Sequence, residues 1–311
     1  MRRIIIDTDP GVDDTMAILL AFSSPELKIE GLATVFGNTE TAITTANALR
    51  LVELAGHPGV PVARGAEKPL LRPFTGDGWR VHGRNGLGQV DFPPPKGQPD
   101  PRRAGQFIAD MVLANPGEIT LVPLGPLTNI AIAYALEPRI AQHVREVVLM
   151  GGAAGVAGNV SAVAEANIHN DPEAANIVFH AGWPITMVGL DVTEKTIMSP
   201  AYLDALKDAN TPGTDFIHAV VQHYMQFYLD LGLTGMPVHD SSAIAYLIDP
   251  TLFTTQRAFV DVEYQSAHHC GQTVADWRGQ RGQPPNVQVC HDVDSARFLA
   301  MYRQRLTGAH Q

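Results

Sequence analysis

Short apolar segments alternate with amphipathic ones over the first two-thirds of this 311-residue chain, and this alternation constrains the fold most. The apolar segments are typical of buried strands, and they lie at residues 4–6, 32–35, 60–63, 119–122, 147–150 and 185–188. The segments between them have helical periodicity, at residues 15–22, 41–55, 102–114, 127–136 and 172–180. Strand and helix repeated in this order predict an α/β fold: an open, mostly parallel central sheet with helices on both faces, like a Rossmann core.

The pattern changes after about residue 250. Residues 259–264, 272–275 and 286–289 are typical of strands joined by turns, and residues 295–305 of a closing helix. We therefore expect a small C-terminal β-rich extension within a single domain that spans residues 1–311. Residues 70–101 are rich in Gly, Pro and polar side chains and too long for a simple connection, which indicates either a disordered excursion or a flexible active-site flap.

Composition excludes several classes of partner. The formal net charge of −10 and the pI of about 5.6 oppose binding to nucleic acid or to an anionic membrane surface. No segment approaches the roughly 18 uninterrupted apolar residues of a membrane helix. The two cysteines, Cys270 and Cys290, have no CxxC spacing and are expected to be reduced, which is typical of a cytoplasmic protein.

The strongest local signal is the acidic sequence DTDPGVDD, which follows the first predicted strand. The strand delivers Asp7 and Asp9 to its carboxyl end on one face, and Asp13 and Asp14 fall at the start of the next helix. A capping role explains Asp13 but not four carboxylates within eight residues. Their mutual repulsion is relieved by a hard divalent cation, and ligands bind at this edge of open α/β sheets. The sequence therefore predicts a metal site here.

Two other motifs place acids in a similar loop. An EF-hand requires acids at its first, third and fifth positions, and the fifth position counted from Asp7 is Gly11, so that motif does not match. A haloacid-dehalogenase-like phosphatase also has a DxD sequence after an apolar strand. In that alternative Asp7 is the nucleophile, Asp9 the acid/base and magnesium the ion.

Two further segments can supply ligands to this edge of the sheet. LVPLGPLTN, residues 121–129, reads as a strand, a turn and a helix start, so a backbone carbonyl of its turn can reach a cation near Asp9. An ordinary βα turn also accounts for that segment. PVHD sets His239 and Asp240 before an apolar helix, where a cap and a surface histidine are sufficient explanations taken alone.

A third polar segment, residues 158–175, follows the strand that ends at Met150. Asp171 is most simply the N-cap of the helix that begins with the next proline. The sequence does not indicate a helix-capping role for Asn159, Glu165 or Asn167. Amides and carboxylates gathered in a loop suit the recognition of several hydroxyls, as on a sugar.

Taken together, these segments resemble the inosine–uridine-preferring nucleoside hydrolases over nearly the whole chain. DTDPGVDD, VVLMGG, GNVSAVAEAN with DPEAA, and PVHD occur in the family's order, and no phosphatase-style lysine motif accompanies them. The resemblance implies calcium-dependent hydrolysis of the N-glycosidic bond of ribonucleosides to ribose and free base, in nucleoside catabolism and salvage. It also implies a homodimer or homotetramer. A nucleoside-binding protein that has lost catalysis is a third alternative.

The resemblance implies a role for each matching position. The Ca²⁺ ligands correspond to the carboxylates of Asp9, Asp14 and Asp240 and the backbone carbonyl of Leu124. Asp9 also corresponds to the acceptor of a proton from the attacking water. The remaining matches contact the ribose hydroxyls (Asp13, Asn38, Asn167), the 5′-hydroxyl (Asn159, Glu165), the sugar (Met150) and the leaving base (His239, with His82 on the flap). The turn before Asn159 is one residue longer than the family pattern.

Cleavage of an N-glycosidic bond makes demands on these groups. Calcium lowers the pKa of water less than zinc does, so a neighbouring base such as Asp9 is required. A protonated His239 or His82 can donate a proton to the leaving base. Aromatic stacking on that base is a further possibility, for which Tyr224, Tyr228 and Trp79 are the candidates.

Overall fold

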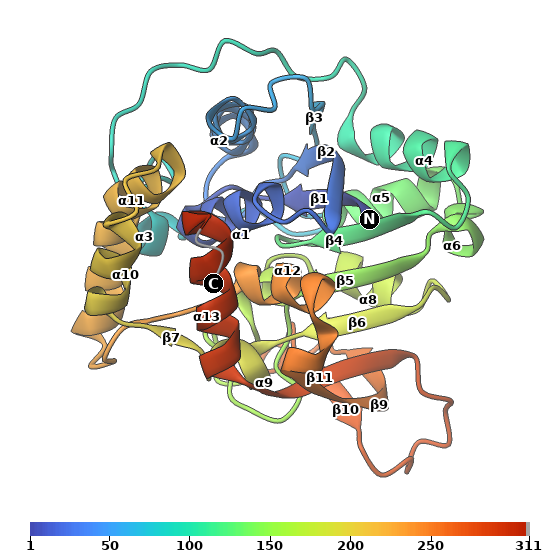
Figure 1. The fold of residues 1–311 in the computed structure, drawn as a ribbon. Helices are drawn as coiled ribbons and strands as arrows, with labels where there is room; N and C mark the ends of the chain where they lie inside the picture. The colour runs from blue at the N-terminus through green and yellow to red at the C-terminus, as the bar shows by residue number, and fades with distance from the viewer. Residues whose placement is uncertain (309–311) are drawn as a thin grey trace.

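A nine-stranded sheet runs through the protein in this computed structural model, which describes residues 1–308 (Figure 1). Its strand order is β10-β9-β11-β6-β5-β4-β1-β2-β3. Neighbours from β11 to β3 pair in parallel, whereas β9 and β10 are antiparallel, which confirms the mostly parallel sheet. The strands are β1 (Arg2–Thr8), β2 (Leu27–Thr34), β3 (Val62–Arg64), β4 (Ile119–Pro123), β5 (Glu146–Met150), β6 (Ile185–Val188), β9 (Phe253–Val262), β10 (Thr273–Asp276) and β11 (Val287–Val293), with β7 (Ile197–Met198) and β8 (Met236–Pro237) forming a separate pair.

Helices connect most of the parallel strands. They are α1 (Val12–Phe22), α2 (Thr41–Leu54), α3 (Trp79–His82), α4 (Ala104–Ala114), α5 (Thr128–Leu136), α6 (Ile140–His143), α7 (Ala166–Asn170), α8 (Pro172–Phe179), α9 (Leu190–Thr193), α10 (Pro200–Lys207), α11 (Pro212–Asp230), α12 (Asp240–Ile248) and α13 (Ser295–Thr307), with a 3₁₀ turn at Pro250–Leu252. Among residues 1–308, no helix combines the length and the apolar character that crossing a bilayer requires.

The sheet is covered on both faces, because side chains of a strand alternate between them. In β1, Ile4 and Ile6 pack into the core formed with α1, α2, α10, α11, α12 and α13, and Ile5 packs into the core formed with α4, α5 and α8. Figure 1 shows α12 and α13 on the near side of the sheet and α5 and α8 on the far side. Apolar contacts thus cover both faces of the sheet. Polar side chains that can bind a ligand are therefore expected at the ends of the strands.

The C-terminal strands join the edge of the main sheet. β11 pairs in parallel with β6, and β9 runs antiparallel beside it. Val287 and Val289 of β11 lie in the same apolar core as Ile185 of β6. The change of pattern near residue 250 therefore marks a change of strand direction at one edge, within the same core.

The first helix begins earlier than the periodicity indicates. α1 starts at Val12 with Gly11 as its N-cap, and the backbone N–H of Gly11 donates to Oδ2 of Asp14 (2.9 Å). Asp14 thus satisfies a backbone donor at the helix end, the task that the sequence assigned to Asp13. Both acids lie inside the first helical turn.

Residues 70–101 pack on the rest of the molecule at several points. The Arg72 guanidinium binds the Glu173 carboxylate of α8, and Glu53 of α2 accepts the N–H groups of residues 96 and 97. The Phe92 ring stacks on Phe216 of α11, with ring centroids 4.3 Å apart. A single domain with a flap that moves stays a prediction.

Candidate functional site

Polar side chains gather at the carboxyl end of β1, between its neighbours β4 and β2 in the sheet. The chain passes from β1 to β2 on one side of this position and from β4 to β5 on the other. The loops that follow the two central strands therefore diverge and leave a crevice in which a ligand can bind. The loops after β1, β2, β4 and β5 all emerge at this edge. The first turn of α12 also reaches it, because α12 packs on α1.

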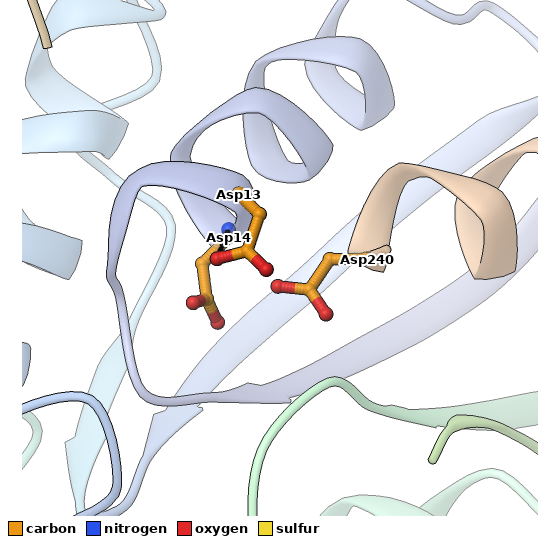
Figure 2. Close-up of side chains that lie close together, drawn as sticks. All are labelled: Asp13, Asp14 and Asp240. Atoms are coloured by element: carbon orange, nitrogen blue, oxygen red, sulfur yellow. Dashed lines mark hydrogen bonds between the residues drawn. The ribbon is translucent and has the colours of Figure 1, made fainter. Parts of the chain in front are cut away.

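Three carboxylates from distant parts of the chain converge here. Oxygen atoms of Asp13, Asp14 and Asp240 lie within 4.8 Å of one another, and Figure 2 shows Asp13 and Asp14 at the start of α1 beside Asp240 at the start of α12. Burial raises the pKa of Asp13 and of Asp14 to about 6, and burial together with the neighbouring acids raises the pKa of Asp240 well above its ordinary value. Such a cluster is stabilised by a cation.

Asp9 lies beside this cluster, outside the closest group of three. Its Oδ2 accepts the backbone N–H of Asn38 (2.7 Å), whereas its Oδ1 is buried and has no hydrogen-bond partner among the described residues. Burial, followed by the charge of Asp14, raises the pKa of Asp9 well above its ordinary value. A buried carboxylate oxygen without a partner next to three other acids is the kind of ligand that a cation completes.

Two glycines make room for the Asp9 carboxylate. A Cβ atom at Gly37 would overlap Oδ2 of Asp9, and a Cβ atom at Gly125 would overlap Oδ1. Both approaches would be far closer than a van der Waals contact allows. The loops after β2 and β4 therefore need glycine at these positions to clasp the carboxylate.

We predict that Gly125→Ala lowers activity strongly while the protein stays folded. The added methyl group would displace the Asp9 carboxylate or the turn that carries the Leu124 carbonyl, since it would overlap Oδ1 of Asp9. The expected loss in kcat/KM is about 100-fold or more, as for other misplacements of a catalytic group by about an ångström. Steady-state rates and a melting curve check this, with Gly59→Ala as the control, since a Cβ atom at Gly59 would meet nothing within 4 Å. Unchanged rates in Gly125→Ala would contradict the assignment of the Asp9 carboxylate to the functional site.

Asp14 is held by a set of hydrogen bonds. Its carboxylate accepts from the Thr8 hydroxyl, from the backbone N–H groups of Asp9 and Gly11, and from Nδ2 of Asn38 (2.9 Å). Nδ2 of Asn38 also donates to the carbonyl of Asp9. These bonds fix the acidic loop before any ligand arrives, and they account for the position of the Asn38 side chain.

Leu124, Met150 and Asn167 meet at the ends of β4 and β5. Nδ2 of Asn167 donates to the carbonyl oxygens of Leu124 (2.7 Å) and Met150 (3.2 Å). The N–H of Leu124 in turn donates to the carbonyl of Asp7 in β1. The sequence assigned the Leu124 carbonyl to the cation and Asn167 to a sugar hydroxyl, and the structure places the two groups in contact with each other.

Glu165 corrects one interpretation of the sequence. Its carboxylate accepts the backbone N–H groups of Gly152, Asn167 and Ile168, and it is the N-cap of α7. The expectation that no helix cap explains Glu165 is therefore wrong. α7 has only five residues, too few for helical periodicity to reveal it. Asn159 is exposed, and its Oδ1 accepts the N–H of Ala166 at the start of the same helix.

His82 lies in α3, next to the first turn of α1. Its Nδ1 accepts the backbone N–H of Val12 (3.2 Å) and lies 3.6 Å from the Asp13 carboxylate. An accepting Nδ1 places the proton of the neutral ring on Nε2. Burial lowers the pKa of His82 to about 4, so the ring is neutral at pH 7.

A chain of hydroxyl groups connects the acidic cluster to His239. The Tyr224 hydroxyl donates to Oδ2 of Asp13 (3.3 Å) and lies 3.4 Å from the Tyr228 hydroxyl, which lies 3.1 Å from Nε2 of His239. Nδ1 of His239 meets the Thr193 hydroxyl at 2.9 Å. Burial lowers the pKa of His239 to about 4. Both histidines are thus neutral at pH 7, in contrast to the protonated donor that the sequence led us to expect.

Comparison with known proteins agrees with this geometry. The sequence model of the family described as inosine-uridine preferring nucleoside hydrolase matches residues 4–300. The inosine-uridine preferring nucleoside hydrolase of Crithidia fasciculata is 43% identical over 303 residues, which cover 96% of each chain.

The chain belongs to this family. Among solved structures, a plant nucleoside hydrolase superposes with a TM-score of 0.95 at 34% identity and covers 99% of both chains. A purine-preferring ribonucleoside hydrolase from Gardnerella vaginalis superposes with a TM-score of 0.94 at 36% identity, over 99% of this chain and 98% of the other.

The acidic site of this family member can hold a metal ion. Its donors are carboxylate oxygens, and no cysteine takes part in the acidic group that the described residues form. Oxygen-only ligands favour hard cations such as Ca²⁺ and Mg²⁺ over zinc or copper. The unpartnered Oδ1 of Asp9 fits the same ion.

Asp7 argues against the phosphatase alternative, as does membership of the hydrolase family. The side chain is fully buried, and its Oδ1 accepts from Nδ2 of Asn129 (2.7 Å). Burial raises the pKa of Asp7 to about 8, so the carboxyl group is largely un-ionised at pH 7. A buried neutral acid cannot attack phosphorus. Asp7 instead ties β1 to the first turn of α5.

Sequence reasoning missed Thr193, which holds His239, and assigned Tyr224 and Tyr228 to stacking rather than to hydrogen bonding. Thr193 lies in α9, a single turn of four residues with no pattern of its own. Tyr224 lies where a helical aromatic residue is normally part of the core, and its ring is fully buried. Trp79, the other stacking candidate, is 38% exposed with the Arg84 guanidinium over its ring.

Proposed function

We propose that this protein hydrolyses the N-glycosidic bond of ribonucleosides, giving ribose and the free base, and that it requires Ca²⁺. The observation that carries the proposal is the convergence of Asp13, Asp14 and Asp240 beside the unpartnered Oδ1 of Asp9, at the sheet edge where α/β proteins bind ligands. Membership of the nucleoside hydrolase family supports the same reaction.

The cation is held, in this proposal, by the carboxylates of Asp9, Asp14 and Asp240 and by the carbonyl of Leu124. When bound, calcium supplies positive charge that favours deprotonation of water and orients the vicinal hydroxyls of a sugar. The Leu124 carbonyl already accepts from Asn167, and an oxygen with two lone pairs can serve both partners.

Asp9 is the base that takes a proton from the attacking water. Its Oδ2 is fixed by the Asn38 N–H, whereas its Oδ1 has no hydrogen-bond partner among the described residues, so the two lone pairs of Oδ1 can serve the cation and the proton. Asp13, Asn38 and Asn167 bind the ribose hydroxyls, and Met150 lies against the sugar. Fixed carboxylates around the ring stabilise the positive charge that develops as the bond to the base breaks.

The leaving base meets hydrogen-bond donors that are neutral at rest. His82 offers Nε2–H, since its Nδ1 accepts from Val12. His239 lies at the end of the hydroxyl chain from Tyr228, which can pass a proton along the chain without a charged imidazole at rest. Protonation of the leaving base itself needs a charged donor: a proton that reaches His239 along the hydroxyl chain gives an imidazolium, and its low pKa makes it a strong acid toward a weakly basic leaving group.

We predict that Tyr228→Phe lowers kcat about 10- to 100-fold on inosine or uridine, at the lower end of the range for general acid–base catalysis. The variant keeps the ring and removes the hydroxyl that lies 3.1 Å from Nε2 of His239. A p-nitrophenyl riboside, whose leaving group needs no proton, should be cleaved at nearly the wild-type rate. An equal loss on both substrates would show that Tyr228 does not serve the leaving group.

The direct test is release of reducing sugar from a panel of purine and pyrimidine ribonucleosides, with and without added Ca²⁺. Ribose release that depends on calcium supports the proposal, and the ranking of substrates gives the base preference. Binding of nucleosides by calorimetry without ribose release would instead identify a catalytically inactive binding protein. Assembly as a homodimer or homotetramer and a cytoplasmic location stay predictions.

A further inference from the structure

Asp191 is a buried carboxylate that lies outside the acidic cluster, in the single-turn helix α9. The residue is 5% exposed, and each of its oxygens accepts a backbone N–H: Oδ2 from Ala154 (2.8 Å) and Oδ1 from Gly155 (2.7 Å). Hydrogen bonds to a charged acceptor are stronger than those between neutral groups. The charge of Asp191 is therefore directed at two consecutive peptide groups of the loop after β5.

The two preceding peptide groups are held in the same manner. The N–H of Gly152 donates to Oε2 of Glu165 (2.9 Å), and the N–H of Ala153 donates to the hydroxyl of Thr273 in β10 (2.8 Å). Four successive N–H groups, residues 152–155, thus end on side chains from three separate parts of the chain. Because each of these four N–H groups has a side-chain acceptor, the irregular segment 152–155 is a rigid support for the loop that follows.

The loop that follows, residues 156–163, is largely exposed and carries Asn159. The hydrogen bonds that hold it are local: the N–H of Gly158 donates to Ala162, the N–H of Val160 donates to Ala164, the Ser161 hydroxyl accepts the N–H groups of residues 163 and 164, and Oδ1 of Asn159 accepts from Ala166. Its placement over the site consequently depends on the fixed residues 152–155 at one end and on α7 at the other.

The same helical turn also contacts the catalytic histidine. Thr193, two residues after Asp191, meets Nδ1 of His239 at 2.9 Å. The N–H of Leu190 donates to the carbonyl of Gly152 (2.9 Å), which seats α9 directly on the loop. α9 therefore contacts both the segment that supports the Asn159 loop and the histidine proposed to serve the leaving base.

We propose that Asp191 is a positioning residue for substrate selection: by fixing residues 154 and 155 in the held segment 152–155, it places Asn159 and Glu165 against the 5′-hydroxyl of the ribonucleoside. This inference rests on the proposed function. Asp191 itself does not touch the substrate. The binding energy that the enzyme draws from the 5′-hydroxyl depends on Asp191, and that drawn from the remainder of the nucleoside does not.

The test compares inosine with 5′-deoxyinosine as substrates of Asp191→Asn. Asparagine keeps one acceptor oxygen and turns an NH₂ group toward a peptide N–H, so one of the two bonds is lost. We expect kcat/KM on inosine to fall about tenfold or more, mainly through KM, and kcat/KM on 5′-deoxyinosine to change less than about threefold. Thr193→Val is the matched variant in the same turn, and it should lower kcat on both substrates equally.

If Asp191→Asn fails to fold, a second variant tests the same role. Thr273→Val removes the hydroxyl that holds Ala153 from the side of β10, and it should show the same selective loss on inosine. Equal losses on both substrates in the folded variant, or a wild-type enzyme that does not distinguish them, would overturn the role of Asp191. Absence of reducing-sugar release by the wild-type enzyme from either nucleoside would instead overturn the proposed function.

Discussion

Asp9→Ala is expected to abolish ribose release from inosine and uridine and to weaken calcium binding. The variant removes the base and one ligand of the cation together. General-base catalysis alone contributes about 10²–10⁴-fold, so with the cation also weakened the rate should fall to background. The buried Oδ1 that has no partner among the described residues is the atom whose loss causes this effect.

Two further variants make the Asp9 experiment specific. Asp9→Asn keeps the shape of the side chain and removes its charge, so a retained calcium affinity with a lost rate would separate the base from the ligand. Asp230→Asn changes an exposed carboxylate at the C-terminal end of α11 and should leave both properties unchanged. Ribose release by reducing-sugar assay and calcium affinity by calorimetry are the readouts. Wild-type turnover in Asp9→Ala would refute the mechanism.

The sequence predicts what depends on local pattern. The predicted strand at residues 185–188 coincides with β6, and the strand at residues 119–122 differs from β4 by one residue. The acidic loop is equally local, since Asp9, Asp13 and Asp14 belong to one strand end and one helix start. The apolar segments must be buried on both faces of a parallel sheet, so the positions of the strands follow from the local sequence pattern alone.

The sequence does not predict what depends on packing between distant elements. Asp13 belongs to the closest carboxylate group because α12 brings Asp240 to its side, and its bond to Tyr224 exists because α11 packs on α1. The neutral state of His82 follows from its burial beside α11 and α1, where desolvation outweighs the attraction of Asp14. Periodicity records which face of a helix is apolar, and it carries no information on which polar groups meet across two helices.

Removal of calcium by a chelator is expected to stop turnover and to lower the melting temperature at neutral pH. A ligand at 100 times its Kd stabilises the folded state by about 2.7 kcal/mol, which for a chain of 311 residues corresponds to a shift of roughly 4 °C. Relief of the repulsion among the buried carboxylates is part of this stabilisation. Readdition of Ca²⁺ should restore both the rate and the melting temperature.

The size of this stabilisation should grow as the pH rises from about 5 to about 7.5. In the metal-free protein the folded-state pKa values of Asp13 and Asp14 are about 6, above the ordinary value of 3.8. A raised pKa in the folded state means that the folded protein binds more protons than the unfolded chain. The stability that these groups contribute is therefore complete below about pH 4 and is lost as the pH rises through about 6. Calcium binds the deprotonated carboxylates, so it compensates most where that loss is greatest.

Asp240→Asn distinguishes this explanation from a general effect of chelators. Removing one of three crowded carboxylates relieves repulsion, so the chelated variant should melt at a higher temperature than the chelated wild type at about pH 7.5. The same variant loses a ligand, so added Ca²⁺ should no longer raise its melting temperature, and its rate on inosine should fall by several orders of magnitude. A chelated wild-type enzyme that released ribose at full speed would contradict the metal requirement. A chelated Asp240→Asn variant less stable than the chelated wild type would show that repulsion among Asp13, Asp14 and Asp240 is not what the cation relieves.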